Sequence, residues 1–177
     1  STGVQMAGWF NREINSIADL QGLKMRIPGL AGDVFAEAGG TAVRIPGGEL
    51  YTSLQTGVID AAEWVGPYND LALGLYEVAK YYYYPGWHEP GSMLELIINK
   101  SSYEALPPDI QAIVTYAARA VNQDMLDEFT ARNNAALEDL VKNHGVQLRR
   151  LPDEVLLALY RGSETVMQKL VSEDPMA

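Results

Sequence analysis

The sequence contains no cysteine and only two histidines among its 177 residues. The absence of cysteine excludes disulfides, thiolate metal sites and cysteine nucleophiles together, and it is compatible with an oxidising compartment. Neither His88 nor His144 has a partner at the spacing of an HExxH zinc site. The GxSxG, GxxxxGK and GxGxxG patterns are also missing. Short motifs therefore give no argument for catalysis or for nucleotide binding.

Positive charge is scarce as well. Thirteen lysines and arginines stand against 23 acidic residues, which gives a formal net charge of −10. Nucleic acids and anionic membrane surfaces bind clustered basic side chains, so this balance disfavours both as partners. No apolar run approaches the ~18 residues that a membrane-spanning helix needs, so no such helix is expected. The chain starts at Ser1 without a basic-plus-apolar leader, so we expect any signal peptide to be absent from this sequence.

The sequence does contain alternating strand and helix patterns. Residues 23–28, "LKMRIP", alternate apolar and basic side chains and predict a half-buried strand, and residues 29–40 predict a short helix closed by glycines. The pair recurs as "AVRIPGG" at 42–48 and "ELYTSLQTG" at 49–57, and "VID" at 58–60 begins a third extended piece. This alternation predicts an α/β sheet, in which ligands bind beyond the carboxyl ends of the strands.

The second half of the chain is expected to be mostly helical. After an aromatic strand at 81–84 and a further strand, "MLELII", at 93–98, helical spacing of apolar residues runs from 106 to 145. An unbroken helix over this span would be roughly 50 Å long at ~1.5 Å per residue. That length exceeds the width of a lobe built from the preceding residues. We therefore expect that the helix either kinks or acts as a spine that spans a larger structure. A last amphipathic helix is predicted at 151–171.

Two arginines precede identical turns. "RIPG" occurs at 26–29 and again at 44–47, so Arg26 and Arg44 have nearly the same local setting. A guanidinium at such a turn can hold a carboxylate through a two-pronged hydrogen bond, whereas the ordinary alternative is a solvent-facing arginine. Periodicity does not choose between Arg26 and Arg44.

Two glutamates lie in surroundings that are short of charge. Glu63 follows two alanines and precedes Trp64 in "AAEWVGPY", and Glu89 lies in "WHEPG". A carboxylate there needs a cation or several donors. The pair could bind one hard cation, with Gln5 or backbone carbonyls completing the shell. Equally, the two could form a general acid/base pair, as in glycoside hydrolysis, or be capped glutamates near turns. His88, beside Glu89, is either a supporting residue or exposed.

Several stretches together resemble a known family. "TGVQMAGWF", "LKMRIPG", "RIPGGELYTSLQTGVIDAAEWVGPY" and "YYYYPGWHEPG" are similar to the solute-binding proteins of TRAP transporters, the DctP-type family, and most similar to its 2-oxo acid and lactate-binding branch. The resemblance implies an α/β fold, the second lobe of a two-lobed periplasmic binding protein (type II-like) with a long kinked C-terminal helix. Residues 1–105 would form the partial ligand-binding lobe and hinge strands, and 106–177 the spanning and C-terminal helices. Family members are about twice this long.

The resemblance also implies roles for individual residues. Arg26, rather than Arg44, falls on the arginine that clamps the substrate carboxylate. Sodium or calcium would bridge protein and substrate, and its implied ligands are Gln5, Glu63, the Trp64 backbone carbonyl and Glu89. Trp64 and Tyr68 would shape the wall of the substrate site. Ser1 is also counted among the implied substrate contacts, although it departs from the family pattern, which has an asparagine there that hydrogen-bonds the substrate.

The implied function is a receptor and not an enzyme. It would bind a small organic acid such as pyruvate or lactate in the periplasm and deliver it to the TRAP membrane subunits. Two alternatives come from other classes of protein. One is a hydrolase that uses Glu63 and Glu89 as its acid/base pair. The other is a fragment that binds no solute and forms a homodimer through the long helix, whose apolar surface would be exposed.

Overall fold

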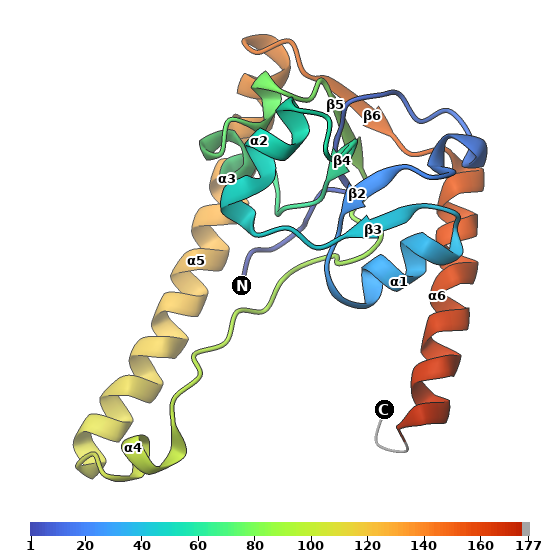
Figure 1. The fold of residues 1–177 in the computed structure, drawn as a ribbon. Coiled ribbons are helices and arrows are strands. Elements are labelled where there is room, and N and C mark those ends of the chain that lie inside the picture. Colours follow the sequence, from blue (N-terminus) through green and yellow to red (C-terminus); the bar gives the residue numbers. More distant parts are fainter. Residues whose placement is uncertain (175–177) are drawn as a thin grey trace.

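The computed structural model describes residues 1–174, and in this part of the chain six strands form one mixed sheet (Figure 1). The strands are β1 (Gly8–Phe10), β2 (Lys24–Arg26), β3 (Thr41–Val43), β4 (Ala61–Ala62), β5 (Tyr81–Tyr84) and β6 (Gln147–Arg150), in the spatial order β3-β2-β4-β1-β5-β6. Strand β2 is parallel to β3 and β4, and β5 is parallel to β6. Strand β1 is antiparallel to both of its neighbours, β4 and β5.

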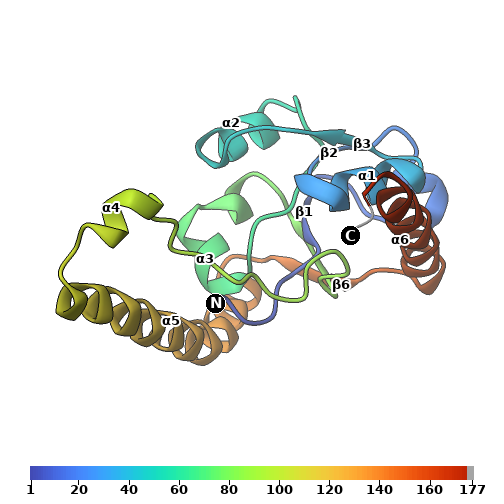
Figure 2. The same cartoon turned by 90° about the horizontal axis from the view of Figure 1, so that it is seen from below.

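The helices follow the strands in sequence and cover both faces of the sheet (Figures 1 and 2). The α-helices are α1 (Gly29–Glu37), α2 (Leu50–Gln55), α3 (Pro67–Ala72), α4 (Lys100–Glu104), α5 (Pro108–Lys142) and α6 (Asp153–Glu173). Three short 3₁₀ helices are η1 (Ile17–Leu20), η2 (Gly47–Glu49) and η3 (Leu75–Glu77). None of the helices in the described residues is both long and apolar enough to cross a membrane.

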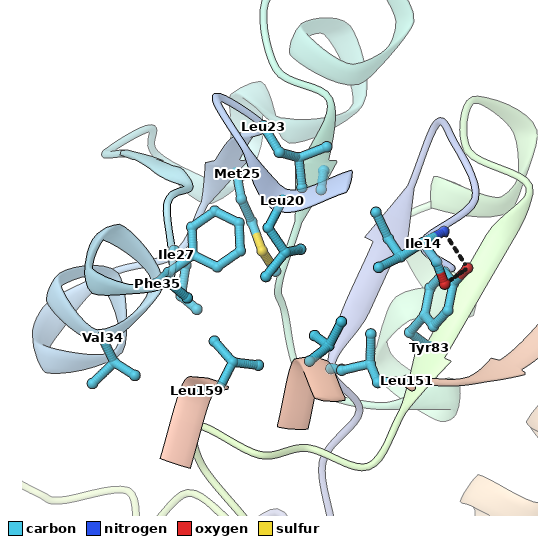
Figure 3. Close-up of a cluster of buried hydrophobic side chains, with 14 of the residues drawn as sticks. Ile14, Leu20, Leu23, Met25, Ile27, Val34, Phe35, Tyr83, Leu151 and Leu159 are labelled. Atoms are coloured by element: carbon cyan, nitrogen blue, oxygen red, sulfur yellow. Dashed lines mark hydrogen bonds between the residues drawn. The ribbon is translucent and has the colours of Figure 1, made fainter. Parts of the chain in front are cut away.

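Adjacent residues of the central strands enter two different cores, as the two-residue period of a strand requires. Phe10, Ala61 and Tyr83 pack with α1 and α6, whereas their neighbours Trp9, Ala62 and Tyr82 pack with α2 and the end of α5. Figure 3 shows the first core, in which the Tyr83 hydroxyl accepts from the Ile14 amide at 2.7 Å. Both faces of the sheet are therefore buried.

The α/β prediction is confirmed, but three details differ. Strand β1 was not predicted because its first residue, Gly8, breaks the apolar pattern, and β6 was not predicted because "QLRR" is largely polar. The predicted strand at 93–98 is wrong for the described chain. These residues are exposed and form no strand, because no other strand there pairs with their backbone.

Helix α5 runs 35 residues without interruption, about 52 Å at ~1.5 Å per residue. Its buried residues, Phe129, Ala136 and Leu140, all lie in its second half. The first half extends away from the sheet together with α4 (Figure 1). The expected spine is therefore present, and much of it has no partner among the described residues.

Candidate functional site

The candidate site lies where β2 and β4 end beside one another. Arg26, the last residue of β2, pairs with Ala62, the last residue of β4. The next residue, Glu63, donates its amide to the Arg26 carbonyl oxygen at 3.0 Å. In return Arg26 Nη1 donates to the Glu63 carbonyl oxygen at 2.9 Å and to its Oε2 at 3.1 Å. The sheet register thus brings together two residues that the sequence singled out.

The Arg26–Glu63 ion pair is buried, with side chains 13% and 5% exposed. A carboxylate with so little water needs an opposite charge or several donors, and Arg26 supplies both. Arg26 Nε also donates to the Ile45 carbonyl oxygen at 3.3 Å. Within residues 1–174 no hydrogen bond engages Nη2 of Arg26. One edge of the guanidinium therefore remains available to a ligand carboxylate.

The Trp64 indole covers the guanidinium. Its ring centroid lies 5.2 Å from Arg26 Cζ, within the range of a cation–π contact. Trp64 Nε1 donates to Asn69 Oδ1, and Gly47 packs so closely on the ring that a Cβ there would be 2.5 Å from Cη2. These contacts fix the ring against Arg26. In the part of the chain described, no hydrogen bond reaches the Trp64 carbonyl oxygen, so it can accept from a cation.

Asp70 fixes the turn at Val65 and Gly66, directly after the site. Its carboxylate is buried, and Oδ1 accepts the Val65 and Gly66 amides at 3.2 and 3.0 Å. Oδ2 accepts Trp9 Nε1 at 2.9 Å and the Tyr82 hydroxyl at 2.8 Å. Burial raises the pKa of Asp70 to about 6, although all four donors act to lower it. The turn is thereby tied to aromatic side chains of the neighbouring strands β1 and β5.

A second carboxylate, Glu89, comes from the loop after β5. Ser92 Oγ donates to Glu89 Oε1, and Gln5 Nε2 donates to Ser92 Oγ at 2.6 Å. Gly86 allows this loop to approach Gln5, because a Cβ there would be 2.6 Å from the Gln5 carbonyl oxygen. The side-chain oxygen of Gln5 is buried and has no donor among the described residues. Such an acceptor is costly to bury unless something else satisfies it.

These residues fit a bound cation. One ligand atom each from Glu63, His88 and Glu89 lies within 4.8 Å of the others. Gln5 adds an unsatisfied amide oxygen, and Trp64 adds a carbonyl oxygen without a donor. Carboxylate, amide and carbonyl oxygens are the ligands of hard cations such as calcium. The structure thus brings two of the predicted ligands, Glu63 and Glu89, into one cluster, together with His88, which was not among them.

The other predicted residues lie elsewhere in the fold. The contacts of Ser1 and Tyr68 are with α5: the Ser1 amine reaches Asn122 Oδ1 at 2.5 Å, and the Tyr68 hydroxyl donates to Glu128 Oε1 at 2.9 Å. The hydrogen bond to Glu128 raises the pKa of Tyr68. Arg44 is exposed and forms no ion pair within residues 1–174. The two "RIPG" arginines thus differ, because Arg26 alone joins the Glu63 network.

Sequence reasoning missed three residues around the site. Asp70 and Ser92 were not singled out, and His88 was left undecided between a supporting and an exposed position. The His88 side chain is only 2% exposed. A faint signal existed for Asp70, which follows the helix-starting Pro67 by three residues in "GPYND". No local signal pointed to Ser92, because its partner Gln5 lies 87 residues away.

A comparison with protein families matches residues 1–174 to the bacterial extracellular solute-binding proteins of family 7, called DctP. The chain belongs to this family. Among its relatives is a monocarboxylate 2-oxoacid-binding periplasmic protein from Nostoc sp. (strain PCC 7120). The two are 45% identical over 174 residues, which make up 98% of this chain and 48% of the Nostoc protein. The predicted family resemblance is confirmed.

Two crystal structures of family members have nearly the same fold. A TRAP periplasmic solute-binding protein from Colwellia psychrerythraea, with bound calcium and pyruvate, is 45% identical, with a TM-score of 0.94 over 99% of this chain and 53% of that protein. Its counterpart from Pseudoalteromonas atlantica, with bound sodium and pyruvate, is 42% identical, with a TM-score of 0.92 over 98% of this chain and 53% of that protein. The chain spans about half the length of these DctP relatives.

Proposed function

We propose that this chain is the second lobe of a periplasmic TRAP-transporter receptor that binds a small 2-oxo or 2-hydroxy monocarboxylate. Arg26 would hold the substrate carboxylate, and a sodium or calcium ion would bridge protein and substrate. The Nostoc relative's name and the pyruvate bound in two homologous structures support this class of solute. They also support sodium or calcium as the cation.

The observation that carries the proposal is the position of Glu63 between a guanidinium and a cation-binding cluster. Oε2 of Glu63 faces Arg26, and Oε1 faces His88, which belongs to the cluster with Glu89. A carboxylate ligand beside Glu63 would therefore meet two positive charges, Arg26 and the cation. With calcium, the charges of Glu63, Glu89, Arg26, cation and substrate would cancel, which favours binding in a buried site.

The remaining residues complete the proposed site. The cation ligands would be Gln5, Glu63, the Trp64 carbonyl and Glu89. Besides Arg26, the substrate would contact the Trp64 indole, and Ser1 and Tyr68 would contribute from the α5 side. Their present contacts with Asn122 and Glu128 would then have to rearrange or be shared.

A receptor fits the geometry better than a hydrolase. A general acid or base must reach the substrate proton, whereas the Glu63 carboxylate is buried with Oε2 paired to Arg26 and Oε1 facing His88. The family consists of solute-binding proteins, which supports delivery to TRAP membrane subunits as the role of the whole protein. Self-association through α5, the third reading, has its own support in the exposed apolar side chains of that helix.

Calorimetric titration with pyruvate and lactate tests the proposal. We expect no heat of binding on metal-stripped protein, binding after calcium or sodium is added, and its loss in Glu63→Gln. Glu164→Gln is a matched control, because Glu164 is exposed on α6. The same titration is repeated on a chain extended to the length of its relatives, because a single lobe could leave the site too exposed to solvent to hold the solute. Solute binding without metal in the extended chain, or none at all, would overturn the proposal.

A further inference from the structure

His88 is a buried imidazole without a hydrogen-bond partner. Its side chain is 2% exposed, yet neither Nδ1 nor Nε2 hydrogen-bonds to any described residue. A neutral imidazole carries one donor and one acceptor, and leaving both unsatisfied in the interior is costly. The ring borders a largely apolar cavity of about 430 Å³ between α1 and α6, with Trp87 beside it. The polar residues of this cavity, Tyr160 and Ser163, form no hydrogen bond with His88, and the Ser163 hydroxyl donates to the Tyr160 carbonyl oxygen instead. On its other side His88 faces Glu63.

The separation of His88 from Glu63 suits two ligands of one ion. His88 Nε2 lies 3.6 Å from Glu63 Oε1, which is long for a hydrogen bond. Metal–nitrogen and metal–oxygen bonds of about 2.0–2.2 Å at a tetrahedral angle put two ligand atoms roughly 3.3–3.6 Å apart. A ligand atom of Glu89 lies within 4.8 Å of both. The three side chains are therefore close enough together to contribute to one cation site.

We propose that His88 supplies an imidazole nitrogen to the cation site. The site then has a mixed set, with oxygens from Glu63 and Glu89 and nitrogen from His88. It binds borderline divalent metals such as Zn²⁺ and Mn²⁺ in addition to hard cations. Nitrogen ligation strengthens Zn²⁺ binding far more than Ca²⁺ binding, because calcium prefers oxygen. The inference rests on the cation site of the proposed function, but it does not depend on which solute binds.

Zinc, manganese and calcium titrations of the metal-stripped protein test this, because the chain has only two histidines. We compare the unmodified protein with His88→Gln and His144→Gln. His144 is the matched control, since it pairs with Asp139 at 3.3 Å beyond the end of α5 and is the other place where imidazole and carboxylate meet. We expect His88→Gln to lose at least about 10-fold in zinc affinity and to change less than about 3-fold for calcium. His144→Gln should leave the high-affinity zinc site unchanged.

Spectroscopy on the unmodified protein gives a readout that does not depend on a variant's folding. Electron spin-echo modulation of bound Mn²⁺ should show a histidine nitrogen, which becomes a ¹⁵N signal after labelling of histidine and persists in His144→Gln. Absence of the nitrogen signal would overturn the inference. Equal losses of zinc and calcium affinity in His88→Gln would also overturn it, because they would mean that His88 only positions Glu63. If pyruvate fails to bind with calcium while the nitrogen signal is present, the solute proposal fails and the His88 ligand stands.

Discussion

Arg26 and Arg44 share the local sequence "RIPG", yet only one has a defined environment. Arg26 donates to Glu63 and Ile45 and lies against the Trp64 ring, whereas Arg44 is exposed. The difference comes from the neighbouring strand, since β4 places Glu63 beside β2 and not beside β3. A repeated motif thus predicts two equal candidates, and sheet order distinguishes them.

Replacement of the two arginines tests which one holds the solute. Arg26→Ala should weaken pyruvate binding by at least about 10-fold, because a charged hydrogen bond contributes about 1.5–3 kcal/mol, whereas Arg44→Ala should leave it unchanged. Because Arg26→Ala also leaves Glu63 buried without its partner, Arg26→Lys is measured beside it as a variant that keeps the charge. Calorimetry gives the affinities, and urea unfolding identifies variants that have lost structure. Equal losses in Arg26→Ala and Arg44→Ala would remove the case for Arg26.

Asp70 supports the turn after the site through four donors that need both carboxylate oxygens. Asp70→Asn replaces one oxygen with an NH₂ group, which faces two donors instead of accepting from them. We expect this variant to lose about 2–4 kcal/mol in the free energy of unfolding, at about 1–3 kcal/mol for each unsatisfied group. Urea unfolding at neutral pH measures the change. A loss below about 0.5 kcal/mol in the free energy of unfolding would contradict the prediction, because it would mean that the four hydrogen bonds to Asp70 do not stabilise the turn.

The raised pKa of Asp70 predicts a pH dependence of stability. Burial raises this pKa from the ordinary aspartate value of 3.8 to about 6, so the folded state holds the proton more tightly than the unfolded state. The resulting stabilisation is complete below about pH 4 and is lost as the pH rises through about 6. The free energy of unfolding, relative to Asp70→Asn, should fall by up to about 3 kcal/mol over this range, at about 1.36 kcal/mol per pKa unit. A flat or rising difference would contradict the prediction.

At the scale of elements, local patterns predicted the parallel part of the sheet well. The alternation in "LKMRIP" correctly predicted β2, and the glycines at 39 and 40 correctly marked the end of α1. Strands β1 and β6 depend on partners far along the chain, which no local pattern reveals. In the site, too, local sequence predicted some residues, whereas others depend on contacts between distant parts of the chain. The sequence pointed to Glu63 and Glu89 as acids in apolar settings, but the Gln5–Ser92 link and the burial of His88 exist only through tertiary packing.

The two glycines of η2 provide a paired test of the Trp64 platform. A Cβ at Gly47 would lie 2.5 Å from Trp64 Cη2, whereas a Cβ at Gly48 would meet nothing within 4 Å. Gly47→Ala should therefore displace the ring from Arg26, weaken pyruvate binding and alter tryptophan fluorescence, and Gly48→Ala should do none of these. We expect Gly47→Ala to cost about 1–3 kcal/mol of stability, as overpacking usually does. If the two variants have equal fluorescence and affinity, the ring does not hold Arg26 in place.

At the scale of the whole molecule, the main feature is an apolar surface without a partner in the described chain. It comprises the 93–98 segment and the first half of α5, with exposed Met93, Leu94, Leu96, Ile97, Ile98, Ile113, Tyr116 and Val121. The 93–98 segment was predicted to be a strand but pairs with no strand among the described residues. Contiguous apolar patches of this kind usually mark an interface. Because the chain spans about half the length of its relatives, we expect the other half to cover this surface in a protein of their length.

In isolation, the 177-residue chain should use the same surface to self-associate. Sedimentation velocity over a concentration series should show a reversible increase in mass. Ile113→Glu should weaken association by at least about 10-fold, because a charge buried without a partner is costly. Asn134→Glu adds the same charge at an exposed position in the second half of α5 and should leave association unchanged. A chain that remains monomeric at all concentrations would contradict association through this surface. Equal effects of the two variants would mean that net charge, and not the apolar surface, controls it.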